Sequence, residues 1–144
     1  MPLLKIWIHF VWATKKREPH LAKESRQLLF KHIKENGKLK NIHVDFVNGH
    51  IDHVHVLVSL NAEQTIARVA QLLKGESAFW ANTNNLFEQK LSWQDEYFAV
   101  SVSESGVNNV REYIKNQERH HQKRTFQQEY DKFMEKYGFE IMKS

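Results

Sequence analysis

Residues 52–58 read Asp-His-Val-His-Val-Leu-Val, and this stretch decides how the rest of the chain can fold. Its β-branched and aliphatic residues favour a β-strand. Successive side chains of a strand point to opposite faces, so His53 and His55 share one face and the valines share the other. Two imidazoles side by side on a strand form half of a metal site. We therefore look in the remaining chain for a scaffold, a further ligand and a reactive group.

The composition predicts one globular domain that spans residues 1–144. Of the 144 residues, 41% are hydrophobic and 26% are charged. No apolar run is long enough to span a membrane and the N-terminus lacks the features of a signal peptide, so we expect a cytoplasmic protein. Cysteine is absent, which excludes disulfides and thiolate metal sites. The net charge of +4 permits a polyanionic partner without requiring one.

The pattern of the chain before residue 104 predicts a ferredoxin-like sheet. Strands are expected over residues 3–13, 41–48, 52–58 and 97–103, with a tight turn at Asn48-Gly49. Helices are expected over residues 21–36, where Gly37 would end the helix, and from Asn61 to about residue 81. The order strand–helix–strand–strand–helix–strand indicates an α+β fold with a ferredoxin-like, or RRM-like, antiparallel sheet. Its first and third strands are central, so the two histidines would lie on a rigid strand.

Two further helices are predicted after the last strand, over residues 106–120 and 125–137. The second begins with a Thr125…Gln128 capping box, carries apolar residues at helical spacing and would end at Gly138. Two helices cover only one face of a four-stranded sheet. We therefore expect these C-terminal helices to cover the face that carries the histidines.

Tyr113 and Gln117 lie four residues apart, one turn along the first of these predicted helices. From there Gln117 could bring an amide oxygen to a metal ion held by His53 and His55, with positions left open for a substrate. A phenol is a poor nucleophile at neutral pH, and a metal-bound phosphodiester is the electrophile that would suit it. The pattern predicts attack by Tyr113 and a covalent phosphotyrosine, which a second 3′-hydroxyl could later reverse without ATP.

These motifs resemble those of the single-tyrosine HUH transposases of small bacterial insertion sequences, including the REP-associated tyrosine transposases. The resemblance rests on His53-Val54-His55 and on Tyr113-Ile114-Lys115-Asn116-Gln117. Further similar stretches lie at residues 9–15, 73–75, 92–94, 101–103 and 120–121. The resemblance implies a homodimeric transposase that cleaves and rejoins single-stranded DNA near hairpin ends through a covalent 5′-phosphotyrosine intermediate. In this interpretation Tyr113 is the nucleophile, and His53, His55 and Gln117 hold Mg²⁺ or Mn²⁺.

The ligand chemistry refines the expected metal. Mg²⁺ prefers oxygen ligands, whereas Mn²⁺ accepts mixed nitrogen and oxygen ligands more readily, and a tightly bound Zn²⁺ would be an inhibitor or an artefact. Asp52 is adjacent to the pair, but strand alternation places it on the opposite face. We therefore expect Asp52 to be a turn or packing residue.

Basic residues near the predicted site are candidates for contacts with the DNA backbone. Tryptophan side chains could stack on unpaired bases, although packing in the core is the better prediction for most of them. The basic candidates are Lys15, Lys16, Arg17, Lys74, Lys115, Arg119, Lys123 and Arg124.

Two other interpretations stay open. The first is a non-catalytic nucleic-acid-binding module with a ferredoxin-like sheet, such as an inactive or domesticated transposase, which would bind DNA without either histidine. The second is a metal-dependent phosphodiesterase that uses water, releases a free 5′-phosphate and tolerates Tyr113→Phe.

Overall fold

The computed structural model, which describes residues 1–121 and 125–138, has the predicted α+β fold. Its antiparallel sheet consists of β1 (Trp7–Ala13), β2 (His43–Gly49), β3 (His53–Ser59) and β4 (Phe98–Val102). The strand order β2-β3-β1-β4 places β1 and β3 at the centre, as in a ferredoxin-like sheet. Strand β3 is hydrogen-bonded to a neighbour on each side, which makes it a rigid support for side chains.

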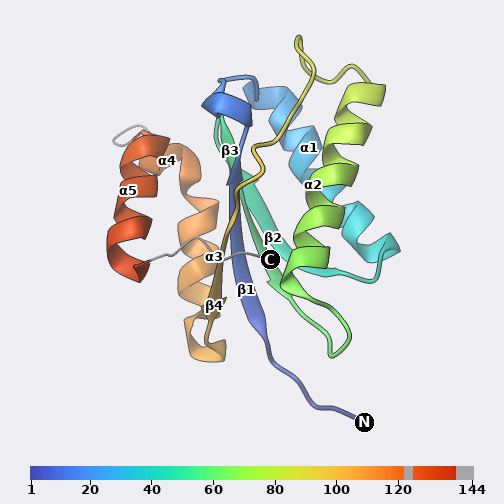
Figure 1. Cartoon of the computed structure of the whole chain (residues 1–144), viewed down its shortest axis with the longest axis vertical. Coiled ribbons are helices and arrows are strands. Elements are labelled where there is room, and N and C mark those ends of the chain that lie inside the picture. Colours follow the sequence, from blue (N-terminus) through green and yellow to red (C-terminus); the bar gives the residue numbers. More distant parts are fainter. Residues whose placement is uncertain (122–124, 139–144) are drawn as a thin grey trace.

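Helices cover both faces of the sheet (Figure 1). Helices α1 (Lys23–Leu39) and α2 (Ile66–Thr83) lie on one face. Helices α3 (Val107–Lys115), α4 (Gln117–His121) and α5 (Phe126–Tyr137) lie on the other, as the sequence predicts for the C-terminal part. The predicted capping box of Thr125 and Gln128 begins α5, and Gly138 ends it in the left-handed conformation with a φ of 58°. No helix of the described residues is long and apolar enough to cross a membrane.

Successive side chains of β1 and β3 point to opposite faces of the sheet, so each face has its own hydrophobic clusters. The larger cluster lies under α1 and α2 and includes Phe10, Trp12, Val54, Val56 and Val58. The opposite face carries smaller clusters, which include Trp7, Val11, Leu57 and Phe98, packed against α3 and α5. The predicted faces of β3 are therefore confirmed. Of the four tryptophans, Trp7, Trp12 and Trp93 are buried in these clusters.

Helix α1 continues past Gly37, which the sequence pattern predicts as its end. Gly37 is buried against β2, where a Cβ atom would lie 2.7 Å from Cγ2 of Val44 and 3.1 Å from the carbonyl oxygen of Ile42. The glycine therefore serves close packing, and the chain turns only at Asn41, whose φ is 58°.

Two other predicted boundaries also differ. The first strand begins at Trp7, because residues 3–6 are exposed and precede the sheet. Helix α2 begins after Thr65, whose hydroxyl accepts a hydrogen bond from the backbone N–H of Arg68. The predicted start at Asn61 is instead a turn, in which the Asn61 N–H donates to the side chain of Gln64.

Replacement of Gly49 by alanine should lower the free energy of unfolding by about 1–3 kcal/mol, the usual cost of overpacking. The added Cβ would overlap the carbonyl oxygen of His53 and lie 2.9 Å from Cα of Val54. Gly75→Ala is the matched control, because a Cβ at this exposed position of α2 meets nothing within 4 Å. It should stabilise the helix by up to about 1 kcal/mol. Equal stability of the two variants in chemical denaturation would contradict the close approach at Gly49.

Candidate active site

The imidazoles of His53 and His55 lie on the face of β3 that α3, α4 and α5 cover, and both are fully buried. Because side chains alternate between the two faces of a strand, both imidazoles lie on this face, as predicted. The ring of Phe126, at the start of α5, stacks on His53 with centroids 4.3 Å apart and an interplanar angle of 20°. The two histidines are thus held away from water at the centre of the sheet.

His53 and His55 each contact another side chain at Nδ1, which we call the outer partner. Nδ1 of His53 lies 2.8 Å from Oδ1 of Asp52, and Nδ1 of His55 lies 2.9 Å from Nε2 of His9 on β1. A carboxylate can only accept here, so His53 carries a proton on Nδ1, and in the neutral ring Nε2 is then the nitrogen that can bind a metal ion. The same arrangement holds for His55 when it donates to His9. These are the partners that orient metal-binding imidazoles in other proteins.

The expectation that Asp52 points away from the histidines is wrong. Strand β3 begins at His53, so Asp52 belongs to the preceding bend, where alternation does not apply. Its carbonyl oxygen accepts a hydrogen bond from the N–H of Thr14, which holds the bend against the end of β1. The Asp52 carboxylate can therefore turn back to His53.

His9 stays neutral in this environment. Burial, together with the neighbouring His55, lowers the pKa of His9 to about 3. Burial also lowers the pKa of His55, despite the nearby carboxylate of Glu129. Neutral imidazoles are the form that binds metals.

Glu129 of α5 brings a carboxylate to the two histidines, which the sequence analysis did not predict. Its Oε1 lies 3.1 Å from Nε2 of His55, and its Oε2 lies 3.5 Å from Nε2 of His53 and 2.8 Å from Nε2 of His121. Burial alone would raise the pKa of Glu129, but the charges that His55 and His53 can carry and the hydrogen bond of His121 hold it well below its usual range. Glu129 is therefore ionised.

These groups could hold a divalent metal ion. One donor atom from each of His53, His55 and Glu129 lies within 4.8 Å of the other two. Nε2 of His55 is buried and has no hydrogen-bond partner of acceptable geometry, although a carboxylate oxygen is only 3.1 Å away. Such close electron-pair donors fit a shared cation better than they fit one another. Two imidazole nitrogens and a carboxylate oxygen suit a divalent transition-metal ion.

Gln117 reaches the same place, but not from the helix that was predicted. Helix α3 ends at Lys115, and Gln117 begins α4, so a single helix over residues 106–120 is a wrong prediction. The side-chain amide of Asn48 donates to the carbonyl oxygens of Ile114 and Lys115 at 3.0 and 3.1 Å, which stabilises the end of α3. Oε1 of Gln117 still lies 3.1 Å from Nε2 of His53 and 3.1 Å from Nε2 of His121.

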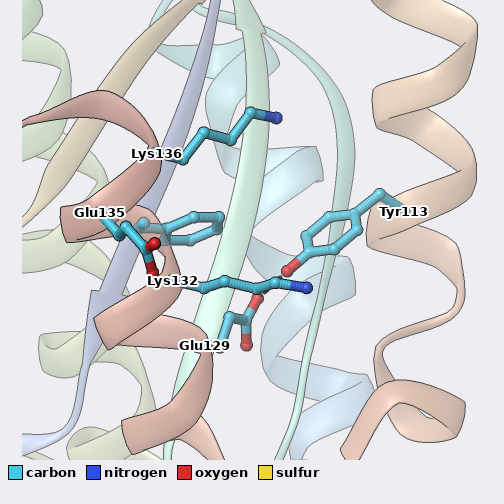
Figure 2. A pocket seen from close by; sticks show the side chains of 6 residues that line it. Tyr113, Glu129, Lys132, Glu135 and Lys136 are labelled. Atoms are coloured by element: carbon cyan, nitrogen blue, oxygen red, sulfur yellow. Dashed lines mark hydrogen bonds between the residues drawn. The ribbon is translucent and has the colours of Figure 1, made fainter.

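Tyr113 on α3 faces this cluster. Its ring is edge-on to His55, with centroids 5.6 Å apart, and its hydroxyl donates a hydrogen bond to Glu129. Beside it lies a cavity of about 600 Å³, lined by Tyr113, Glu129, Lys132, Phe133, Glu135 and Lys136. Figure 2 shows the phenol pointing across this cavity from α3 toward α5. A ligand in the cavity would therefore have access to the Tyr113 hydroxyl.

The basic residues singled out in the sequence lie in different environments. Lys15, Lys16, Lys115 and Arg119 are exposed. The guanidinium of Arg17 lies over the ring of Tyr130, 4.6 Å from its centroid, and thus packs on α5. Lys74 is half-buried and donates to the backbone carbonyls of Gln94 and Asp95, so it supports a loop. Lys123 and Arg124 lie outside the described residues.

Glu129 and His9 were not predicted as site residues, and each has only a weak signal in the sequence. Glu129 lies within the apolar stripe of α5, three residues after Phe126 and four before Phe133, where a charge needs a partner. His9 lies on the same face of a central strand as His55, as the ferredoxin-like order implies. Neither signal identifies its partner without the packing of the helices.

The chain matches one family model and is similar to several solved structures. Residues 3–117 match the family model described as "Transposase IS200 like", a range that includes His53, His55, Tyr113 and Gln117 but not α5. A candidate transposase from Deinococcus radiodurans R1 is 26% identical, with a TM-score of 0.62 over 81% of this chain and 93% of that chain. The structure of a REP-associated tyrosine transposase bound to a REP hairpin is 14% identical, with a TM-score of 0.61 over 84% of this chain and 72% of that chain, and shares the fold. No curated protein matches the sequence significantly.

Loss of the outer partners should weaken metal binding. His9→Leu and Asp52→Ala each remove the group that orients a histidine, so we expect Mn²⁺ affinity to fall about 10–100-fold in isothermal titration calorimetry. His32→Leu is the control, because His32 stacks on Trp80 between α1 and α2, outside this site. Unchanged Mn²⁺ affinity in folded His9 and Asp52 variants would contradict the tautomer assignment.

Proposed function

Since the chain belongs to the IS200-like transposase family, we propose that it cleaves and rejoins single-stranded DNA near hairpin ends through a covalent 5′-phosphotyrosine. One observation carries this proposal. The hydroxyl of Tyr113 is hydrogen-bonded to the carboxylate of Glu129, which also lies 3.1 Å from Nε2 of His55. A nucleophile and a set of metal donors thus meet in one buried site beside an open cavity.

His53, His55 and Gln117 are the proposed ligands of Mg²⁺ or Mn²⁺, and Glu129 adds a fourth donor on the other side of the site. A bound ion would supply Lewis-acid stabilisation to the charge on the phosphate and on the departing oxygen. The protein groups have separate tasks. Asp52 and His9 hold the imidazoles in the ligand tautomer, and the packed helices bury both imidazole rings.

In the proposed cleavage step, Oη of Tyr113 bonds to the phosphorus as the bond from phosphorus to the 3′-oxygen breaks. The phenol proton leaves along the hydrogen bond to Glu129 and passes to solvent, because a carboxylate with a lowered pKa does not retain it. The departing oxygen takes up a proton and becomes a free 3′-hydroxyl. The 5′-phosphate stays on Tyr113.

Rejoining is the reverse reaction with another strand. A 3′-hydroxyl attacks the phosphotyrosine, the new phosphodiester forms and Tyr113 takes back its proton. The energy of the broken bond is kept in the protein–DNA bond, so no nucleotide triphosphate is required.

The proposed substrate is single-stranded DNA with hairpin ends, and the proposed assembly is a homodimer. The match to the family and the exposure of basic side chains support the DNA substrate, whereas the homodimer is proposed from the resemblance of the motifs to the single-tyrosine transposases. We propose phosphate contacts for the exposed Lys15, Lys16, Lys115 and Arg119. Arg17 and Lys74 are weaker candidates because other groups of the protein already engage them.

Tyr113→Phe should bind hairpin DNA as tightly as the wild type and form no covalent adduct. The test incubates labelled single-stranded hairpin DNA with protein and Mn²⁺ and separates the products on denaturing protein gels. The label should stay on the wild-type protein only when it lies on the 3′ side of the cut. Tyr97→Phe, which alters a ring packed against the core, is the matched control and should keep the adduct.

Three results would contradict the proposal. An adduct that survives in Tyr113→Phe would exclude this nucleophile. Cleavage without any adduct, with a free 5′-phosphate, would indicate a hydrolase that uses water. Binding without cleavage in either Mg²⁺ or Mn²⁺ would indicate a non-catalytic binding module.

A further inference from the structure

We infer that the cavity beside Tyr113 binds the backbone of the single DNA strand that Tyr113 attacks, with Lys132 and Lys136 of α5 contacting its phosphates and Phe133 stacking on a base. This inference rests on the proposed function and adds a DNA-binding site on α5. That helix lies beyond residues 3–117, the part of the chain that matches the family. None of these three residues stands out in the sequence as a DNA contact.

The cavity has the size and the position that a nucleotide needs. Its volume of about 600 Å³ lies within the range of small-molecule sites, about 300–1,000 Å³. Its walls come from α3, which carries Tyr113, and from α5, which carries the other five lining residues. A strand lying in the cavity would present a phosphate directly to the phenol. The proposed attack needs such an approach to the Tyr113 hydroxyl.

The charges of the cavity suit a phosphate backbone. Lys132 and Lys136 are four residues apart, so their side chains lie on one face of α5. The ammonium of Lys136 also lies 5.1 Å from the ring centroid of Tyr137, an exposed contact at the end of α5 from which it can turn to a phosphate. Figure 2 shows both chains extending from α5 across the cavity, with Lys132 directed toward Tyr113. Two ammonium groups spaced along one helix face can contact successive phosphates of one strand.

The cavity also contains two carboxylates, which do not cancel this attraction. The Glu129 carboxylate accepts a hydrogen bond from the Tyr113 hydroxyl, and its oxygens lie 3.1 Å from Nε2 of His55 and 2.8 Å from Nε2 of His121, so they are directed into the histidine cluster. Glu135 lies on the α5 side in Figure 2, whereas the lysine side chains reach toward α3. The open side of the cavity is therefore the basic side.

Phe133 gives the cavity an aromatic wall. It lies between the two lysines in the sequence, and its ring centroid is 6.4 Å from that of Tyr113 and 6.4 Å from that of His55. Base–aromatic stacking is tolerant of sequence and accompanies basic grooves in proteins that bind single strands. The combination of two lysines and one aromatic ring thus predicts recognition of an unpaired strand rather than of a duplex.

The test measures binding without cleavage. Fluorescence anisotropy of a labelled hairpin with a single-stranded extension is recorded in EDTA for the wild-type chain and for the double variant K132Q/K136Q, over a range of salt concentrations. Loss of two contacts to a single strand should reduce the slope of log Kd against log salt by about 1.4. If the plots of log Kd against log salt for the wild-type chain and for K132Q/K136Q meet at 1 M salt, this change of slope corresponds to about 25-fold weaker binding at 0.1 M salt.

The matched control is K34Q/K38Q, which removes two lysines four residues apart on α1, across the sheet from the cavity. It should bind with the slope and affinity of the wild type. Phe133→Leu is the second variant and should weaken binding about fivefold or more with no change of slope, because stacking involves no counterions. Thermal unfolding of each variant checks that the fold is intact.

The outcomes separate this inference from the function on which it rests. If the wild-type chain binds and cuts the DNA, but K132Q/K136Q keeps its affinity and full salt slope, the inference is wrong and the proposed function stands. Equal losses in K34Q/K38Q and K132Q/K136Q would also overturn it, since the effect would be one of total charge. If the wild-type chain neither binds nor cuts, both proposals fail.

Discussion

The structure depends on one constraint, which is that two imidazoles must keep their Nε2 electron pairs free inside a protein core. A buried histidine without partners at both nitrogens costs free energy, so Nδ1 of His53 and of His55 must each be satisfied from outside the site. Asp52 and His9 do this at 2.8 and 2.9 Å. The central position of β3, the bend before it and the pairing with β1 all serve that arrangement.

The Nε2 atoms of the two imidazoles impose a second constraint. Their free electron pairs converge with the carboxylate of Glu129, and three groups so close together need positive charge, either as protons or as a metal ion. Helix α5 therefore contributes to the chemistry as well as to the covering of the sheet. The same helix lines the cavity at Tyr113, so in the proposed function the position of α5 would control both the metal donors and the access of DNA to Tyr113.

Much of this arrangement can be predicted from the sequence, because the signals are local. Strand alternation assigns His53 and His55 to one face, and the Thr125 capping box and Gly138 define α5 to within a residue. The failures arise where packing overrides a local rule. Gly37 has the sequence signal of a helix end, but its role is to allow close approach to Val44. Asp52 does not follow the alternation of strand side chains because it lies in a bend. Glu129 was missed because only the packing of α5 on β3 brings it to the histidines.

The most direct test of the central claim is identification of the residue that becomes bonded to DNA. The wild-type protein is incubated with single-stranded hairpin DNA and Mn²⁺, digested with nuclease and trypsin, and analysed by tandem mass spectrometry. The account predicts a nucleotide joined through its 5′-phosphate to Tyr113 in the tryptic peptide of residues 112–115. A nucleotide on any other residue, or complete cleavage with only free 5′-phosphate ends, would contradict it.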